Sequence, residues 1–136
     1  VTPSYYEVSS IEELAEFARS GGLGHNVDKL YVPAGVPSGA ELMGIKANIT
    51  FVEYDYIYRG KTLKLKWMIH YVPEEYFSKI RYAAPGGEWH GDYYIAEING
   101  TQVHWEQYGK VFVALLPSGA GMETIESFCT VRPVEF

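Results

Sequence analysis

Hydrophobic residues recur at helical spacing in one stretch near the N-terminus, SSIEELAEFARSGG. Ser10 and Glu13 have the spacing of a capping box, in which each side chain satisfies a backbone amide at the start of a helix. Gly21 and Gly22 follow and provide a helix end. The stretch therefore predicts an N-terminal helix with one apolar side. That side is formed by Ile11, Leu14, Ala15, Phe17 and Ala18.

Alternating hydrophobic and polar residues dominate much of the remaining chain, which is typical of β-strands. Two such runs flank Arg59-Gly60, which predicts a hairpin with its tight turn at these two residues. In that register Asp55 faces Lys64. Glu53 then faces Lys66, so opposite charges meet on one side of the hairpin. The apolar pairs on the other side are Tyr56–Leu63, Tyr54–Leu65 and Val52–Trp67.

Two further turns are predicted at Asn99-Gly100 and Tyr108-Gly109. The pairs about the first turn are Ala96–Val103 and Tyr94–Trp105, and those about the second are Trp105–Phe112 and Val103–Ala114. Both turns place Val103 and Trp105 on the same apolar face, so the two inferences agree. We expect the N-terminal helix to cover the opposite face, which carries Ile95, His104, Val111 and Val113.

The rest of the pattern completes an α+β fold. Residues 122–128 predict a short helix that is followed by an extended segment, whereas residues 73–92 fit either a helical turn or an irregular strand. No fixed-period repeat, low-complexity tract or long linker divides the chain. We therefore predict a single domain, residues 1–136, in which an antiparallel meander sheet carries the N-terminal helix on one face, together with a short C-terminal helix.

Composition and charge narrow the possible partners. Of the 136 residues 15% are aromatic, twelve of them tyrosine, which suits half-buried sheet surfaces. Eleven basic and seventeen acidic residues give a net charge of -6. The main basic concentration, Arg59, Lys61, Lys64 and Lys66, adjoins acidic residues. Binding to nucleic acid depends on clustered Lys and Arg, so we expect no nucleic-acid partner.

The chain offers little information about its compartment. Its single cysteine, Cys129, cannot form an internal disulfide, which suits a cytosolic protein or an exported protein without disulfides. No apolar run reaches the roughly 20 residues of a membrane-spanning helix, so we expect no membrane insertion by this segment. The sequence begins at Val1 without a signal-like stretch, which leaves open a signal or membrane tether upstream.

The stretch GGEWHGDYY, residues 86–94, carries the main candidates for ligand binding. Trp67 and Trp105 are assigned to the core, whereas Trp89 is free to project and its flat ring suits stacking against a ligand. The predicted ligand-binding residues are Trp89, His90, Tyr93 and Tyr82.

Alternation in an extended segment could also bring three potential metal ligands to one side. These are Glu88, His90 and Asp92, and an imidazole with two carboxylates suits a divalent ion. However, no HExxH, CxxC or EF-hand spacing accompanies them. We therefore predict no metal site and no cofactor, with these three residues as the candidates for one.

Nucleophilic catalysis has little support in the sequence. Cys129 lies in an apolar terminal stretch, FCTVRP, where a free thiol usually behaves as a small inert hydrophobe. No GxSxG motif is present. We therefore expect a non-enzymatic protein.

Two stretches resemble a known family. LYVPAGVPSGAEL and INGTQVHWEQYGKVFVALLPSGAGMETIESF are similar to a Gram-positive extracytoplasmic domain family of uncharacterised function. Members are often the outer portion of membrane-anchored bacterial proteins, some of them linked to anti-sigma regulators. The resemblance implies an exported, secreted or cell-surface module for sensing or interaction, and it carries over no catalytic residues.

Three functions follow as hypotheses. The first is an extracytoplasmic binding or sensory module whose partner is a protein or a small molecule. The second is a carrier that holds an apolar or sugar ligand between a curved, tyrosine-rich sheet and the helix. The third is a metal-assisted enzyme that uses His90.

Overall fold

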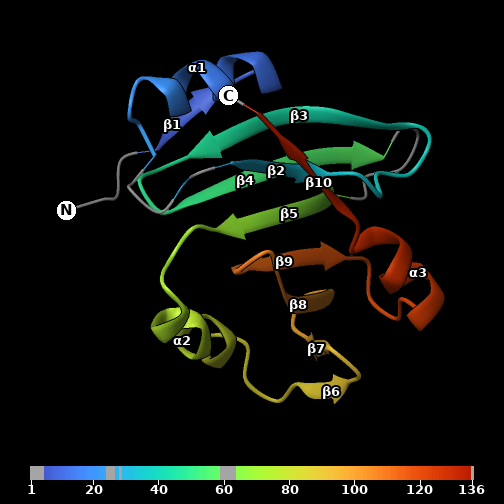
Figure 1. Cartoon of the computed structure of the whole chain (residues 1–136). Helices are drawn as coiled ribbons and strands as arrows, with labels where there is room; N and C mark the ends of the chain where they lie inside the picture. Colours follow the sequence, from blue (N-terminus) through green and yellow to red (C-terminus); the bar gives the residue numbers. More distant parts are fainter. Residues whose placement is uncertain (1–4, 24–26, 28, 59–63, 136) are drawn as a thin grey trace.

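An eight-stranded antiparallel sheet forms the body of the protein (Figure 1). The computed structural model describes residues 5–23, 27, 29–58 and 64–135, except the side chain of Tyr82. The strands are β1 (Tyr6–Val8), β2 (Leu30–Pro33), β3 (Ala40–Ala47), β4 (Phe51–Tyr58), β5 (Lys64–His70), β6 (Glu88–His90), β7 (Tyr93–Glu97), β8 (Thr101–Gln107), β9 (Lys110–Leu116) and β10 (Val131–Val134). The helices are α1 (Ile11–Arg19), the 3₁₀ helix η1 (Glu74–Tyr76), α2 (Phe77–Tyr82) and α3 (Met122–Phe128). The predicted α+β class, with an N-terminal helix and a short C-terminal helix, is confirmed.

The sheet consists of two meanders that meet in its middle. Its strand order is β1-β3-β4-β5-β9-β8-β7-β6, and β2 and β10 form a separate two-stranded sheet. Strands β3 to β5 are consecutive neighbours, and so are β6 to β9. The meanders join where β9 pairs with β5, so that Ala114 faces Trp67 and Phe112 faces Ile69. Both halves of the chain therefore share one hydrophobic layer.

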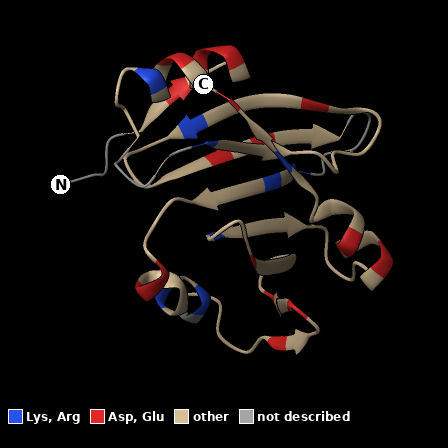
Figure 2. Ribbon diagram, viewed as in Figure 1, with Lys and Arg blue, Asp and Glu red and all other residues tan. Residues whose placement is uncertain are grey.

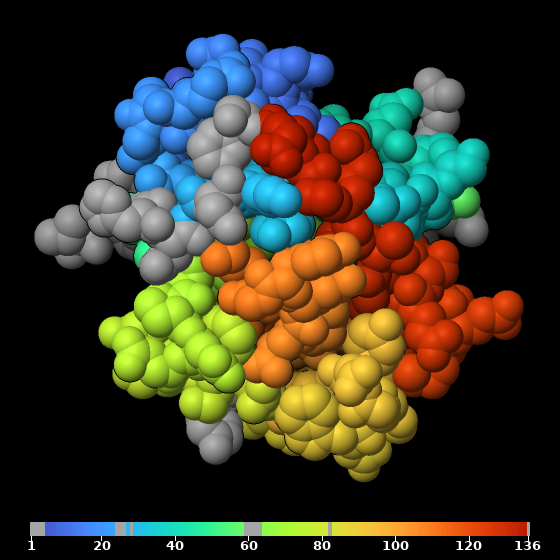
Figure 3. Space-filling view, in the orientation of Figure 1, coloured from blue at the N-terminus to red at the C-terminus, as the bar shows by residue number. Residues whose placement is uncertain are grey.

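Three elements cover the main apolar face of the sheet. Helix α1, the β2–β10 pair and α3 all contribute side chains to the same core (Figure 1). In Figure 3 the colours of α1, β2 and the C-terminal segment adjoin one another on the surface of this layer. The largest fully buried side chains of this core are Trp67, Tyr54, Tyr71, Phe112, Leu14 and Leu30.

Helix α1 begins where the capping pattern predicts. The Ser10 hydroxyl accepts a hydrogen bond from the Glu13 amide at 3.2 Å. The Glu13 carboxylate instead accepts from the amide and the hydroxyl of Ser9, at 3.1 and 3.0 Å. The helix ends at Arg19 with Ser20 as its C-cap, and Gly21 adopts a positive φ of 84° that favours glycine. The caps fix both ends of the helix, and Leu14, in its middle, is buried in the core.

Buried tyrosine hydroxyls attach β2 to the sheet. The Tyr54 hydroxyl donates to the Tyr31 carbonyl at 2.9 Å, and the Tyr71 hydroxyl accepts from the Tyr31 amide at 3.0 Å. The indole N–H of Trp67 similarly donates to the carbonyl of Phe128, at 2.9 Å, at the end of α3. The aromatic side chains of the sheet thus contribute both buried apolar area and hydrogen bonds to the covering layer.

Helix α2, not α1, covers the second face of the sheet. Phe77 and Ile80 pack against Val111 and Val113 there. The prediction that the N-terminal helix covers this face is wrong, because α1 is already buried against the main core. Residues 74–82, which fitted either a helical turn or an irregular strand, form this helical cover.

The β4–β5 register differs from the predicted one by two residues. Asp55 faces Lys66 rather than Lys64, and the apolar pairs shift in the same way. A shift of two residues keeps every side chain on its predicted face, so charged and apolar faces remain separate. Glu53 still contacts Lys66, with 3.7 Å between Oε1 and Nζ. The predicted turn at 59–60 lies outside the described residues.

The β7–β8 register is shifted from the prediction by one residue. The observed pairs are Ile95–Val103 and Tyr94–His104, in place of Ala96–Val103 and Tyr94–Trp105. The connection is the cause: residues 98–100 separate the paired Glu97 and Thr101, where Asn99-Gly100 predicted a two-residue turn. A one-residue shift reverses the sides of a strand, so Ile95 lies on the core face and not on the opposite face.

The Tyr108-Gly109 turn is confirmed together with its register. The observed pairs include Val103–Ala114, Trp105–Phe112 and Gln107–Lys110. Val103 and Trp105 are both buried in the main core, as predicted.

Replacing Tyr54 with Phe tests the tyrosine attachment of β2. The change removes the hydrogen bond from the Tyr54 hydroxyl to the buried Tyr31 carbonyl, so we expect the free energy of unfolding to fall by about 1–3 kcal/mol. Urea denaturation measures this difference. Tyr76→Phe, at an exposed tyrosine, is the matched control and is expected to have almost no effect. Equal stabilities of Tyr54→Phe and wild type would show that the bond is dispensable.

Candidate functional site

Strand β6 forms one open edge of the eight-stranded sheet. Among the described strands it pairs with β7 alone, through Glu88–Ile95, Trp89–Tyr94 and His90–Tyr93. Gly91 and Asp92 make the two-residue turn between the strands, and Gly91 has a φ of 64°. All three residues of β6 are exposed, and Trp89 retains 56% of its accessible surface. The strand therefore presents a large apolar side chain at an unpaired sheet edge.

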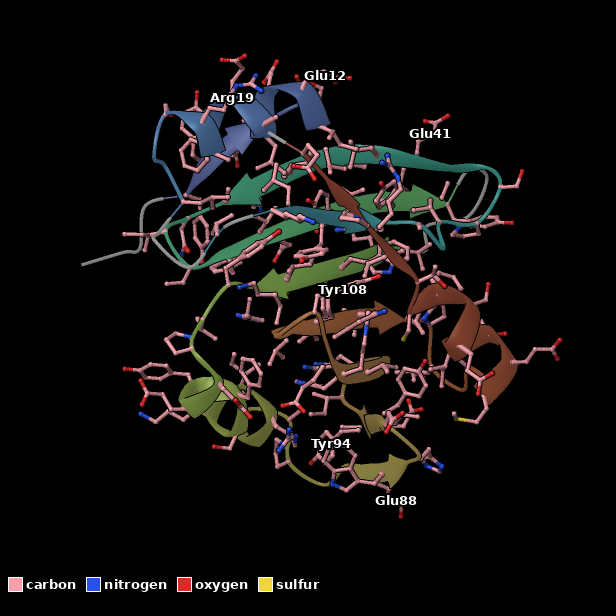
Figure 4. The ribbon with its side chains drawn as sticks, in the orientation of Figure 1. Glu12, Arg19, Glu41, Glu88, Tyr94 and Tyr108 are labelled. Atoms are coloured by element: carbon pink, nitrogen blue, oxygen red, sulfur yellow. The ribbon has the colours of Figure 1, made fainter. Side chains whose placement is uncertain are left out.

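Tyr94 fixes the segment that leads into β6 (Figure 4). Its hydroxyl donates to the Ala84 carbonyl at 2.8 Å and accepts from the Gly87 amide at 3.1 Å. A Cβ at Gly87 would lie 2.4 Å from the Tyr94 ring, so this close approach requires glycine. The Tyr94 ring also meets the Trp89 ring edge to face, with centroids 5.5 Å apart. One side chain thus positions both the backbone before β6 and its indole.

Arg81 supports Trp89 from helix α2. Its guanidinium carbon lies 4.8 Å from the centre of the Trp89 ring, within the range of a cation–π contact. Its Nη2 also lies 3.4 Å from a carboxylate oxygen of Glu106 on β8. Trp89 is therefore contacted from α2 and β7, and Arg81 is itself held from β8. We refer to Arg81, Trp89, Asp92 and Glu106 as the Trp89 surface.

A buried histidine lies behind the Trp89 surface. His104 is 4% exposed, and its Nε2 lies 3.0 Å from the side-chain nitrogen Nε2 of Gln102. Among the described residues no group bonds to its Nδ1, which is also buried. A pocket of about 10 Å³ adjoins it, enough for roughly one water molecule. This pocket is lined by Phe77, Arg81, Trp89, Asp92, His104, Trp105, Glu106 and Val111.

Burial keeps two histidines of the second face neutral. It lowers the pKa of His104 to about 4, with smaller contributions from the neighbouring His70 and Arg81. Burial also lowers the pKa of His70 to about 4. Because a charged imidazole is poorly solvated at these two positions, protonation of either ring opposes folding.

The predicted ligand-binding residues do not form one cluster. Trp89 points to the side of the sheet that α2 covers, next to Tyr94. His90 and its cross-strand partner Tyr93 point to the opposite side, where Tyr93 lies 6.4 Å from the Trp105 ring. The side chain of Tyr82 lies outside the described part of the structure. Trp89 is thus separated from the two other described candidates.

The three candidate metal ligands are also divided. Glu88 and His90 share one side of β6, with 3.8 Å between Oε2 and Nε2. Asp92 lies in the turn and borders the pocket on the Trp89 side. Within residues 5–23, 27, 29–58 and 64–135, no group of three or more His, Cys, Asp or Glu side chains has an arrangement suited to a metal ion.

Cys129 has the environment of an unreactive thiol. It is buried and free, and burial raises its pKa to about 12. Since the thiolate is the nucleophilic form, this environment agrees with the small inert hydrophobe that the sequence predicts.

Sequence reasoning missed Arg81, Tyr94 and Glu106. Arg81 fell in the segment of undecided secondary structure, and the one-residue error in the β7–β8 register placed Tyr94 on the wrong side. One signal was available: a two-residue turn at Gly91-Asp92 places Trp89 directly opposite Tyr94.

The charges near the Trp89 surface have both signs. Figure 2 shows basic residues on α2 and acidic residues on β6 and β7. Lys79 and Arg81 belong to α2, and Glu88 and Asp92 belong to β6 and its turn. None of the described helices combines the length and apolarity needed to cross a bilayer.

Comparisons with protein-family models, curated proteins and solved structures found no match for this chain. The resemblance to an extracytoplasmic family therefore stays a prediction, and the site must be interpreted from its own geometry.

Acidification tests the burial of the two histidines. Their pKa of about 4 lies below the value of 6.5 expected for the unfolded chain, so between these two pH values the unfolded chain binds more protons. The free energy of unfolding should therefore be highest above this window and fall as the pH decreases through it. We expect a loss on the order of 2–3 kcal/mol for each histidine.

Urea denaturation at several pH values measures this loss in wild type and in His104→Gln. The variant removes one of the two groups, so its stability should depend less steeply on pH. His90→Gln, at an exposed histidine, is the control. An unchanged pH dependence in His104→Gln would show that His104 is not buried as described.

Proposed function

We propose that the domain is a non-enzymatic interaction module whose partner binds at the Trp89 surface. The observation that carries this proposal is an indole that is more than half exposed while other side chains hold it in place. An ordered side chain loses little conformational entropy when a partner covers it. Tryptophan and arginine are also enriched among the residues that dominate binding energies.

The open edge of β6 adds backbone groups to this surface. In a two-residue hairpin the residues that flank the turn, His90 and Tyr93, exchange their N–H···O=C bonds. The amide and carbonyl of the preceding Trp89 therefore point outward from the sheet. An extended segment of a partner protein could pair with these groups while its side chains contact the indole.

The proposal includes a location outside the cytoplasm, which the family resemblance implies. The cysteine content favours neither the cytoplasm nor a location outside it, because the one cysteine is buried and makes no disulfide. Sequencing the gene upstream of the Val1 codon tests the location, because an exported module requires a signal or a membrane anchor. A cytosolic domain encoded there without either would contradict this part of the proposal.

Replacing Trp89 with Ala tests the interaction surface. A random-peptide display library selected on the wild-type protein supplies the probes, and titration of the selected peptides measures their affinity. We expect Trp89→Ala to weaken binding by about ten- to hundredfold. Met43→Ala is the matched control, because Met43 is 65% exposed on β3, distant in the sheet order from β6.

A loss of peptide binding is informative only if Trp89→Ala remains folded. Because Trp89 is largely exposed, its removal should lower the free energy of unfolding by about 1 kcal/mol or less. Selected peptides that bind Trp89→Ala as tightly as wild type would contradict the proposal. Severe thermal destabilisation would show instead that Trp89 is a core residue.

A second function, the carrier of an apolar ligand, is favoured by one groove. It has a volume of about 320 Å³, at the lower end of the range of small-molecule sites. It lies at the ends of β4 and β5, next to α3 and its preceding loop, and not beneath α1. The groove is lined by Pro37, Tyr58, Leu65, Pro117, Ser118, Gly119, Ala120, Thr124 and Phe128.

Filling this groove tests the carrier function. Thr124→Trp should occupy part of it and weaken binding of the apolar fluorophore anilinonaphthalene sulfonate by about tenfold. Glu123→Trp places the same residue on α3 outside the groove lining and should leave binding unchanged. A fluorescence titration measures both. Equal fluorophore affinities in the two variants, or no saturable binding to wild type, would exclude this groove as a ligand site.

A further inference from the structure

The residues of β6 and its flanks form a symmetric pattern about Trp89. Residues 87–91 are Gly-Glu-Trp-His-Gly, with Trp89 at the centre. Its two neighbours, Glu88 and His90, have complementary side chains, and the next residue on each side is glycine. We propose that β6 pairs antiparallel with β6 of a second copy of this chain, about a two-fold axis at Trp89. This inference rests on the proposed function, since it names the partner for the same edge.

The backbone of Trp89 suits the centre of such a pair. Its amide and carbonyl point outward because the bonds of the β6–β7 hairpin are made by the neighbouring His90 and Tyr93. In the two-fold arrangement Trp89 and the partner's Trp89 exchange two N–H···O=C bonds. The two indoles then lie beside each other on the α2 side of the joined sheet, as an aromatic cross-strand pair.

Glu88 and His90 provide the complementary side chains. Antiparallel pairing about Trp89 places Glu88 opposite the partner's His90, and His90 opposite the partner's Glu88. Each carboxylate can then accept a hydrogen bond from an imidazole N–H of the other chain. Glu88 and His90 already lie on the same side of β6, 3.8 Å apart, so the four side chains would alternate in one cluster.

The two glycines leave room for the second chain. Gly87 would oppose the partner's Gly91, so that no side chain obstructs either end of the paired segment. Each glycine also has a local reason, since Gly87 packs against the Tyr94 ring and Gly91 has a positive φ. The edge of the hairpin therefore has no side chain at either end of the paired segment, where the strands of the two copies would separate.

The other edge of the main sheet lacks this symmetry. Strand β1 has Glu7 at its centre, between Tyr6 and Val8. The same two-fold pairing would place Glu7 opposite the partner's Glu7, and like charges directly opposite are destabilising. Charge therefore favours pairing of β6 with β6 over pairing of β1 with β1.

The pairing segment is short, which sets the strength of the contact. Strand β6 has three residues, and interfaces that bury less than about 1,200 Å² in total belong to weak, transient complexes. A two-fold pairing uses the edge of both copies and leaves no β6 edge for a third, so it closes at the dimer.

Sedimentation velocity of the intact chain, from about 10 µM to about 1 mM, tests the pairing. The sedimentation coefficient of wild type should rise with concentration toward that of a dimer. Trp89→Lys should abolish the rise, because it places two like charges at the two-fold axis. Met43→Ala, at an exposed residue of β3, is the matched control and should behave as wild type.

A charge exchange separates this pairing from other dimers. Glu88→Lys alone and His90→Glu alone should each weaken association by about tenfold or more, because each removes both complementary pairs. The double variant restores opposite charges across the axis, so its association should return toward that of wild type. Circular dichroism confirms that each variant is folded.

Three results would overturn the inference: a concentration-independent monomer, a dimer that survives Trp89→Lys, or a double variant as defective as the single ones. If wild type stays monomeric while peptides still bind in a Trp89-dependent manner, the inference fails and the proposed function stands. If neither self-association nor Trp89-dependent peptide binding occurs, both fail.

Discussion

The architecture depends on how the backbone of β2 is satisfied within the core. Strand β2 pairs with β10 along one edge, and the amide and carbonyl of Tyr31 are buried against the main sheet. Buried backbone groups without partners are strongly unfavourable, and here the hydroxyls of Tyr54 and Tyr71 bond to them. Burial raises the pKa of Tyr54 well above its usual value, so the hydroxyl remains a donor. Phenylalanine would fill the same space without holding the strand. Tyr54 and Tyr71 therefore have a structural role that does not require a ligand.

The elements that cover the main apolar face of the sheet determine which elements remain to cover the opposite face. With α1, β2–β10 and α3 on the main core, α2 is the helix that covers the opposite face in the described part of the chain, over β5, β8 and β9. The β4 part of that face carries the polar side chains Glu53 and Asp55. There Glu53 lies beside Lys66, and burial, together with a hydrogen bond to Asp55, raises the Glu53 pKa. The limited length of α2 places Arg81 at the outer margin of the covered area, next to β6. The Trp89 surface thus arises where a short helix ends near a sheet edge.

Prediction from the sequence succeeded where the local pattern determines the structure. The α1 cap at Ser10, the Tyr108-Gly109 register and the helix Met122–Phe128 depend on neighbouring residues, and all three are confirmed. The β4–β5 register was wrong by two residues and the β7–β8 register by one. At Asn99-Gly100 the connection is one residue longer than the predicted turn, because the length of a connection depends on the strands that it joins and not on two residues alone. A two-residue error preserved the faces of β5, whereas a one-residue error reversed those of β7. That reversal concealed the contact between Tyr94 and Trp89. The cover by α2 was missed because short helices gain most of their stability from tertiary packing.

An exposed edge strand with a tryptophan is normally a risk for aggregation, and β6 limits that risk by its own features. It is three residues long, and both residues beside Trp89 are polar. Short length and charged side chains are common means of protecting sheet edges. These features do not block the edge completely, because Gly87 and Gly91 leave both of its ends accessible. An incoming strand must therefore satisfy Glu88 and His90 on one side and the indole on the other. In the proposed interaction such an edge would discriminate among partners, whereas a long apolar edge would accept almost any extended chain.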